Sequence, residues 1–257
     1  VSCVGAEPVA LTDCLNFGDP DRPEVSWQLE ECVRGMADAC RALGVPVVSG
    51  NVSLYNETRG EAVYPTPVVG ALGVLEDVTR HAGMAFRQEG DAVVLLGASA
   101  VTGDPATLGG SEYLEVVHGL VAGRPAIDLE QERRVQALCR QAVRRGLVRS
   151  AHDCSDGGLA VALAECCVRG DVGFRGEFSV AGRWDAALFG EAQSRVVVSL
   201  PPERLPELEA LAREHGVPLA RLGTVGGDAI ALPGADPLPL AEAARAWRGG
   251  LLAALGE

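Results

Sequence analysis

Two short polar segments, each at the end of an apolar run, carry the residue types best suited to chemistry in this chain. The first is residues 8–18, PVALTDCLNFG, and the second is residues 45–57, VPVVSGNVSLYNE. Each is typical of a buried strand that ends in acidic, amide, hydroxyl and glycine groups. Open α/β sheets present ligand-binding groups to a crevice at such strand ends. A carboxylate, a carboxamide and a hydroxyl can together hold Mg²⁺ and phosphate oxygens.

The second segment contains the more specific pattern. Gly50 lets the backbone approach a ligand closely, and Asn51 follows with a carbonyl oxygen that can ligate Mg²⁺. Ser53 lies two residues beyond Asn51, so both side chains point the same way on an extended chain. A Gly-Asn turn, with Ser53 bonded to the backbone, explains these residues equally well without a ligand. Asp13 favours a site, because it ends the other strand of the same predicted β-α-β unit. We therefore expect Asp13, Gly50, Asn51 and Ser53 to converge on one crevice.

A second acidic candidate is residues 152–158, HDCSDGG. Asp153, Asp156 and a hydroxyl lie within a few residues of a predicted helix N-terminus, a combination suited to Mg²⁺ and phosphate. The alternative interpretation makes Ser155 or Asp156 a helix N-cap and Asp153 an exposed acid. The sequence leaves both interpretations open.

Two further loops could contact a ligand. Gly109-Gly110 precedes Ser111-Glu112 at a predicted loop-to-helix junction, where backbone N–H groups can cradle an anion. Residues 191–195, EAQSR, carry several polar groups, although a surface turn before a strand is their ordinary explanation. Both signals are weaker than the strand-end pattern.

Composition excludes several classes of protein. The chain has 257 residues, of which 47% are hydrophobic and 22% charged, and these values predict a folded core. The net charge of −13 argues against non-specific binding to nucleic acid or anionic membranes. All 22 basic residues are arginine, which excludes a Walker A loop, a Schiff-base lysine and a lysine general base. Biased genomic composition explains the lack of lysine without changing that exclusion.

The cysteines indicate a reducing compartment. Eight cysteines contain no CxxC pair, and only four histidines accompany them. Free buried thiols are therefore favoured over a zinc site or a disulfide framework. The sequence shows no signal peptide and no unbroken apolar run of membrane-spanning length, so we expect a cytoplasmic protein.

The order of predicted elements favours an α/β or α+β fold in two domains. A helix over residues 27–43, with Ser26 as N-cap and Gly44 as its stop, joins the two strand-end segments. Residues 67–75 predict another buried strand. A polar stretch then breaks the pattern, and we expect domains over residues 1–80 and 81–257.

The second domain shows its own alternation of strands and helices. Residues 91–96 predict a strand, and Asp128 with Gln131 predicts a capping box for a helix that ends at Gly146. Later segments predict helices near 157–169, 202–215 and 239–255 and strands at 147–151, 172–180, 195–200, 218–225 and 228–232.

Four segments together resemble one family, the phosphoribosylformylglycinamidine synthases of purine biosynthesis (PurL). They are residues 4–18, 46–57, 108–113 and 153–159. Residues 12–16, TDCLN, are similar to the small bacterial type, and the resemblance to the second half of these enzymes covers essentially the whole chain. It implies an incomplete PurM-like N-terminal-type domain over 1–80 and a PurM C-terminal-type domain over 81–257.

The resemblance also implies roles for individual residues. Those matching Asp13 and Gly50 contact ATP in the family, the one matching Asn51 binds Mg²⁺, and the one matching Ser53 contacts substrate. A pseudo-symmetric auxiliary nucleotide site, able to hold ADP, is implied at Gly109, Gly110, Asp153, Asp156 and Glu191. The histidine base of the family lies in the first half, so no catalytic residue is expected here.

The implied reaction joins ammonia to formylglycinamide ribonucleotide through an ATP-derived iminophosphate. The implied partners are the first half of the same protein and the PurS and PurQ subunits, the latter supplying ammonia from glutamine. We expect these 257 residues alone to fold at least in part but to be inactive, with an unpaired sheet edge and an apolar patch near residues 1–11.

Two other functions fit the sequence. One is another ATP-using member of the same superfamily, such as an aminoimidazole ribonucleotide synthetase or a selenophosphate synthetase. The other is a non-catalytic nucleotide-binding or assembly module.

Overall fold

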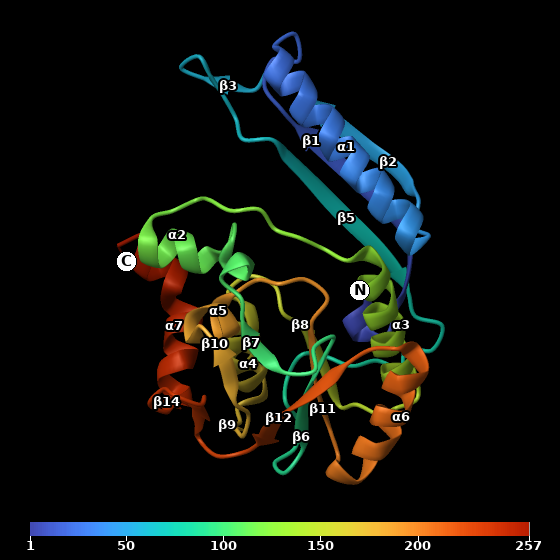
Figure 1. Cartoon of the computed structure of the whole chain (residues 1–257), viewed down its shortest axis with the longest axis vertical. Helices are drawn as coiled ribbons and strands as arrows, with labels where there is room; N and C mark the ends of the chain where they lie inside the picture. The colour runs from blue at the N-terminus through green and yellow to red at the C-terminus, as the bar shows by residue number, and fades with distance from the viewer. Residues whose placement is uncertain (257) are drawn as a thin grey trace. The chain divides into compact units, whose positions relative to one another are not determined.

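The computed structural model describes residues 1–256 and divides the chain into two compact units. The first holds residues 1–2 and 6–76, and the second holds residues 3–5 and the chain from Asp77 onward. In Figure 1 the first unit is blue to teal, and the second runs from teal to red, apart from residues 3–5, which are blue. No helix in the described range combines the length and apolar character needed to span a membrane.

The first unit is built on a three-stranded sheet in the order β2-β1-β5. Strand β1 runs parallel to β2 and antiparallel to β5. The elements of the unit are β1 (Glu7–Asn16), α1 (Pro23–Leu43), β2 (Val47–Ser53), a hairpin of β3 (Glu57–Thr58) and β4 (Glu61–Ala62), and β5 (Thr66–Val74), after a short 3₁₀ helix η1 (Ser2–Val4). The predicted β-α-β connection is confirmed, because α1 joins two neighbouring parallel strands.

The ends of α1 agree only partly with the sequence prediction. Gly44 ends the helix as predicted, with φ 70° and its N–H donating to the Cys40 carbonyl. The predicted N-cap at Ser26 is wrong, because the helix begins at Pro23 with Arg22 before it. Proline fits the first turn of a helix, where its missing N–H costs nothing.

The expected unpaired edge near residues 1–11 is wrong. Strand β1 has a partner on each side, so β2 and β5 are the outer strands of the three-stranded sheet. Val1, Val4 and Val9 are the large apolar side chains exposed in this segment.

The second unit contains a seven-stranded sheet. Its order is β14 (Leu238–Pro239), β13 (Ala229–Ala231), β9 (Phe174–Gly176), β12 (Leu219–Val225), β6 (Ala92–Leu96), β11 (Val196–Leu200) and β8 (Ser150–Asp153), while β7 (Val101–Gly103) and β10 (Val180–Gly182) form a separate parallel pair. The helices are α2 (Glu112–His118), α3 (Leu129–Arg144), α4 (Gly158–Gly170), α5 (Trp184–Phe189), α6 (Leu205–His215) and α7 (Leu240–Ala254), with short 3₁₀ helices η2 (Pro105–Leu108) and η3 (Pro202–Arg204).

Helices cover both faces of the seven-stranded sheet around β6. Alternate residues of this fully buried strand belong to two apolar clusters, because successive side chains of a strand point to opposite faces. Val93 and Leu95 pack in the cluster that contains Leu159 of α4. Val94 belongs to the cluster that contains Leu138 of α3. The predicted α/β class is confirmed.

Two local predictions in the second unit need correction. Asp128 caps α3 as predicted, since its carboxylate accepts the Glu130 and Gln131 N–H groups. Gln131 does not complete a capping box, because its side chain donates to the Gly97 carbonyl at 2.8 Å. The single strand predicted over 172–180 is wrong, since β9 and β10 lie there in different sheets.

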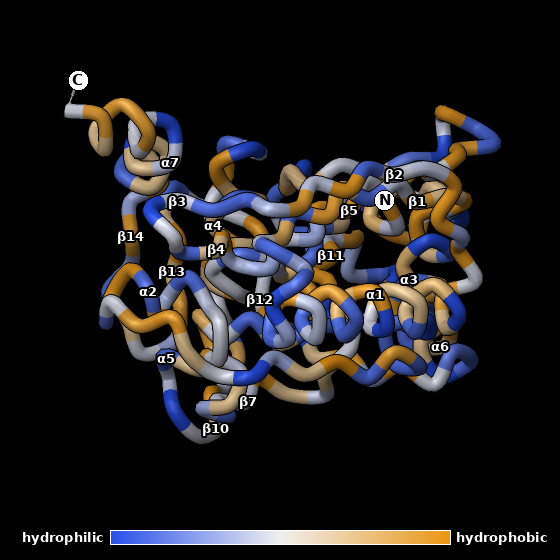
Figure 2. The backbone as a smooth tube through the Cα atoms, turned by 90° about the horizontal axis from the view of Figure 1, so that it is seen from above, coloured by the Kyte–Doolittle hydropathy of each residue, from blue (hydrophilic) through white to orange (hydrophobic). Residues whose placement is uncertain are grey.

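The last turns of α7 are hydrophobic, as the orange tube near the C-terminus shows in Figure 2. Leu251 and Leu252 are exposed there.

Candidate functional site

Strands β1 and β2 bring the two polar segments of the sequence side by side. In their parallel register Asp13 lies opposite Gly50, Cys14 opposite Asn51, and Asn16 opposite Ser53. A Cβ atom added to Gly50 would overlap the Asp13 carboxylate. An alanine at position 50 would therefore push the Asp13 carboxylate away from β2.

The expected convergence of the four strand-end residues on one crevice is wrong. Asp13 and Gly50 belong to one face of the sheet, and Asn51 and Ser53 belong to the other. The reason is the two-residue period of a strand, which sends the side chain after Gly50 to the opposite face. Asn51 and Ser53 do share a face, as their spacing predicts.

A row of polar contacts between β1 and β2 lies on the Asn51 face. The Ser49 hydroxyl donates to Thr12 Oγ1 at 2.9 Å, and Asn51 Nδ2 lies 3.7 Å from the Cys14 thiol. Sequence reasoning missed Thr12, Cys14 and Ser49 as members of this row. The alternation of polar residues in 12–16 and 49–53 was the signal that could have found them.

Ser53 is held by Asn56, which sequence reasoning also left out. Asn56 Nδ2 donates to Ser53 Oγ at 3.0 Å and to the carbonyl oxygens of Ser53 and Phe17 at 2.9 and 3.1 Å. These bonds fix the chain just after β2. The Ser53 hydroxyl is half-buried and keeps a defined direction.

The Asn51 carboxamide can offer one oxygen to a metal ion. Its Nδ2 faces Cys14, which leaves Oδ1 as an available acceptor of the hard type that Mg²⁺ prefers. Across residues 1–256, no three His, Cys, Asp or Glu side chains form a group able to hold a metal ion. The Asn51 carboxamide therefore fits Mg²⁺ as a single ligand, not as part of a three-residue group of this kind in the described range.

In the second unit, three predicted acidic residues line one cavity of about 350 Å³. They are Asp153, Asp156 and Glu191. Gly109 and Gly110 are not among the lining residues, and their N–H groups donate to the carbonyls of Ala106 and Ala122.

Glu191 joins the two loops that the sequence singled out. Its Oε1 atom accepts the Glu112 N–H at 2.9 Å and the Gly157 N–H at 2.8 Å. Glu112 is the first residue of α2, and Gly157 is the N-cap of α4 with φ 76°. The alternative N-caps, Ser155 and Asp156, are wrong, since no side chain caps α4.

Asp153 also belongs to a charged group with His152. Burial alone would lower the pKa of His152, but the Asp153 and Glu165 carboxylates outweigh it and raise that pKa to about 9. His152 Nε2 lies 2.8 Å from Glu165 Oε2, whereas Nδ1 is 3.7 Å from Asp153 Oδ1. The same imidazolium lowers the pKa of Asp153 to about 2. Because His152 lies on β8 and Glu165 on α4, the bond between their side chains links these two elements.

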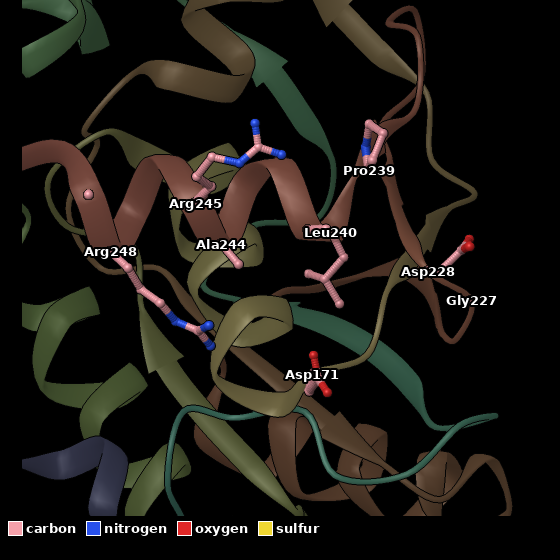
Figure 3. Close-up of a pocket in the computed structure, with 10 residues that line it drawn as sticks. Asp171, Gly227, Asp228, Pro239, Leu240, Ala244, Arg245 and Arg248 are labelled. Atoms are coloured by element: carbon pink, nitrogen blue, oxygen red, sulfur yellow. The ribbon is translucent and has the colours of Figure 1, made fainter. Parts of the chain in front are cut away.

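A larger cavity, of about 860 Å³, lies along α7 and contains none of the predicted site residues (Figure 3). Arg245 and Arg248 extend from α7, while Asp171 and Asp228 come from other segments of the wall. Because none of the predicted site residues lines this cavity, the candidate site remains at the ends of β1 and β2.

Two family models match the chain. Residues 1–75 match the AIR synthase related protein N-terminal domain, and residues 88–232 match the AIR synthase related protein C-terminal domain.

Curated relatives are similar over almost all of this chain. The PurL subunit of phosphoribosylformylglycinamidine synthase from Anaeromyxobacter sp. (strain Fw109-5) is 52% identical over 99% of the chain. The corresponding subunit from Thermomicrobium roseum is 55% identical over 98% of it. In both cases the match covers 34% of the relative, so the chain spans about a third of the length of these proteins.

Solved structures share the fold. The PurLQS structure from Thermotoga maritima has a TM-score of 0.73 and 19% identity, with 95% of this chain and 39% of that chain covered. The T. maritima PurL complex with FGAR gives 0.72 and 19%, covering 95% and 40%. The complex with ATP gives 0.68 and 18%, covering 94% and 38%.

Proposed function

Because the chain belongs to the AIR synthase related protein family, we propose that it forms part of the second half of a phosphoribosylformylglycinamidine synthase, an ATP-dependent C–N ligase. The observation that carries the proposal is that PurL subunits match over half of its residues along nearly its full length. The match includes the strand ends that hold Asp13, Gly50, Asn51 and Ser53.

The proposed reaction consumes formylglycinamide ribonucleotide, ATP and ammonia. The amide oxygen of the substrate attacks the γ-phosphorus of ATP and ADP leaves, which gives an iminophosphate. Ammonia then adds to the imidate carbon and inorganic phosphate leaves, so the products are formylglycinamidine ribonucleotide, ADP and phosphate. Positioning and charge stabilisation dominate such phosphoryl transfers.

We assign the strand-end residues to separate parts of this task. Asn51 and Ser53, on one face of the sheet, would hold the metal and the substrate. Gly50 and Asp13 would contact ATP, with the bare backbone at Gly50 allowing close approach. Mg²⁺, when bound, would supply charge neutralisation for the transferred phosphoryl group. This chain would contribute Asn51 to that ion.

The proposed partners follow from the same relatives. The first half of the protein would supply the base and most metal carboxylates, and PurS and PurQ would deliver ammonia from glutamine. Cys154 is the cysteine that lies in a strand-to-helix turn, between β8 and α4, but it is buried and burial raises the pKa of its thiol to about 12. A reactive thiolate of the glutaminase type is therefore not expected there.

The test is a steady-state assay on the full-length protein. We expect ADP formation that depends on formylglycinamide ribonucleotide and free ammonia, and glutamine use only after PurS and PurQ are added. Glutamine-dependent turnover by the isolated protein would contradict the assignment of partners.

The same assay separates the other candidate functions. Turnover with formylglycinamidine ribonucleotide or selenide in place of formylglycinamide ribonucleotide would indicate a different member of the superfamily. ATP binding without turnover of any of these substrates would indicate a non-catalytic nucleotide-binding module.

A further inference from the structure

The Glu191 carboxylate accepts backbone N–H groups in the way that a bound anion would. One carboxylate oxygen accepts two backbone N–H groups, from Glu112 and from Gly157, which are 79 and 34 residues away in the chain. Hydrogen bonds from backbone N–H groups to a carboxylate are stronger than those between neutral groups. A single side chain therefore ties the first residue of α2 to the N-cap of α4.

The loop that carries Glu191 is itself fixed. The Glu191 N–H donates to the Thr107 carbonyl at 2.9 Å, and the Arg195 guanidinium donates to the carbonyls of Gly190 and Ala192. Ser194, in the same loop, has φ 61°, in the left-handed region. The carboxylate is thus presented from a held backbone.

The adjoining cavity has the wrong charge for a phosphate. Four carboxylates line it, and the guanidinium that lines it is occupied by carbonyl oxygens. These carboxylates belong to Glu132, Asp153, Asp156 and Glu191. A phosphate would add further negative charge to these carboxylates. The N–H group of Gly158, which follows the lining residues in the chain, already donates to the Ser155 carbonyl.

We propose that Glu191 is a resident anion, a positioning residue that holds the starts of α2 and α4 together and keeps phosphate groups out of this cavity. The carboxylate already accepts the N–H groups of Glu112 and Gly157, so neither group is left to bind a phosphate. The inference concerns the second unit alone and does not depend on the proposed synthase activity.

The test compares phosphate binding by the full-length protein with that of E191A. Equilibrium dialysis with radiolabelled inorganic phosphate counts equivalents bound per chain, so a site elsewhere in the protein contributes equally to each variant. We expect E191A to bind one equivalent more than the wild type, and phosphate to raise its unfolding temperature. The matched control is E132A, which removes a carboxylate from the same cavity without freeing either N–H group, and should bind no more than the wild type.

A second measurement keeps the proposal testable if E191A does not fold. Glutamine at position 191 retains an acceptor oxygen but loses the charge, so E191Q should exchange the Glu112 and Gly157 amide hydrogens about fivefold faster. Unchanged exchange at both amides would overturn the proposal. Equal phosphate binding by the wild type and a folded E191A would overturn it as well.

Discussion

The carboxylate of Asp13 occupies the position where a side chain on Gly50 would begin. The two residues face each other across the parallel pair β1 and β2, and they come from the two polar segments that stand out in the sequence. The glycine therefore serves two purposes: it makes room for the acid and leaves the backbone of β2 open to a ligand. A larger residue at position 50 would therefore change where the Asp13 carboxylate lies.

Substitution of Gly50 by alanine should be destabilising, because the added methyl group displaces the Asp13 carboxylate. We expect G50A to lower the free energy of unfolding by up to about 1 kcal/mol, because Gly50 is exposed and the half-buried Asp13 side chain can rotate away. Urea denaturation of the full-length protein measures this loss. G35A is the control, since a Cβ at Gly35 in α1 meets nothing within 4 Å.

A double mutant tests the cause of that loss. D13A removes the group that the new methyl would strike, so D13A/G50A should lose less than the sum of the single mutants. Additive losses would mean that the cost of G50A does not come from Asp13.

Asn51 gives a second prediction, which concerns activity. N51L removes the carboxamide oxygen and should cut ammonia-dependent turnover of the full-length protein roughly 100-fold or more. S49A, two residues earlier on the same face, loses the bond to Thr12 and should change turnover little. Near-normal kinetics for N51L would exclude Asn51 as a metal ligand.

The raised pKa of His152 predicts a loss of stability at alkaline pH. The charged imidazolium is favoured in the folded state, because its pKa is about 9 there and 6.5 ordinarily. The stabilisation is therefore fully present below pH 6.5 and is lost as the pH rises toward about 9. It amounts to at most about 3 kcal/mol. Denaturant unfolding across this interval measures the loss.

Two variants serve to assign that loss to His152. E165Q removes the carboxylate 2.8 Å from Nε2 and should flatten the pH dependence. H81Q changes an exposed histidine and should leave the slope unchanged. An equally steep loss in E165Q would show that another group titrates.

Much of the fold could be predicted because residues close in the sequence are enough to determine several helix ends and strands. Gly44 ends α1 because only its left-handed conformation closes the helix, and the sequence pattern contains that information. Gln131 could not be predicted in the same way, because its side chain bonds to Gly97, 34 residues distant in the chain. Tertiary contact decides such cases.

The candidate site shows the same limit. The spacing of Asn51 and Ser53 predicts their common face, since a strand has a fixed period. Which residue of β2 lies opposite Asp13 depends on the register between β1 and β2, and the sequence does not specify that register. The sequence singles out Glu191 as a polar loop residue, but only the fold shows that it accepts the N–H groups of Glu112 and Gly157.

The three-stranded sheet of the first unit exposes large apolar side chains on both outer strands. They include Val48 and Val52 on β2 and Val68 and Leu72 on β5, between 55% and 67% exposed. An exposed apolar strand at a sheet edge is a template for pairing with another chain.

We therefore expect the 257-residue chain, produced alone, to self-associate through this sheet. Sedimentation velocity should show species larger than a monomer, in proportions that rise with protein concentration. Lysines at Val48 and Leu72 should shift the distribution toward monomer, because a charge on an edge strand opposes edge-to-edge pairing. V116K is the matched control, since Val116 is 78% exposed but lies on α2 in the other unit, and it should leave association unchanged. If the wild-type chain stays monomeric at high concentration, the prediction that this sheet mediates self-association is wrong. Equal effects of V116K and the double lysine variant would show that charge alone, rather than the sheet, controls association.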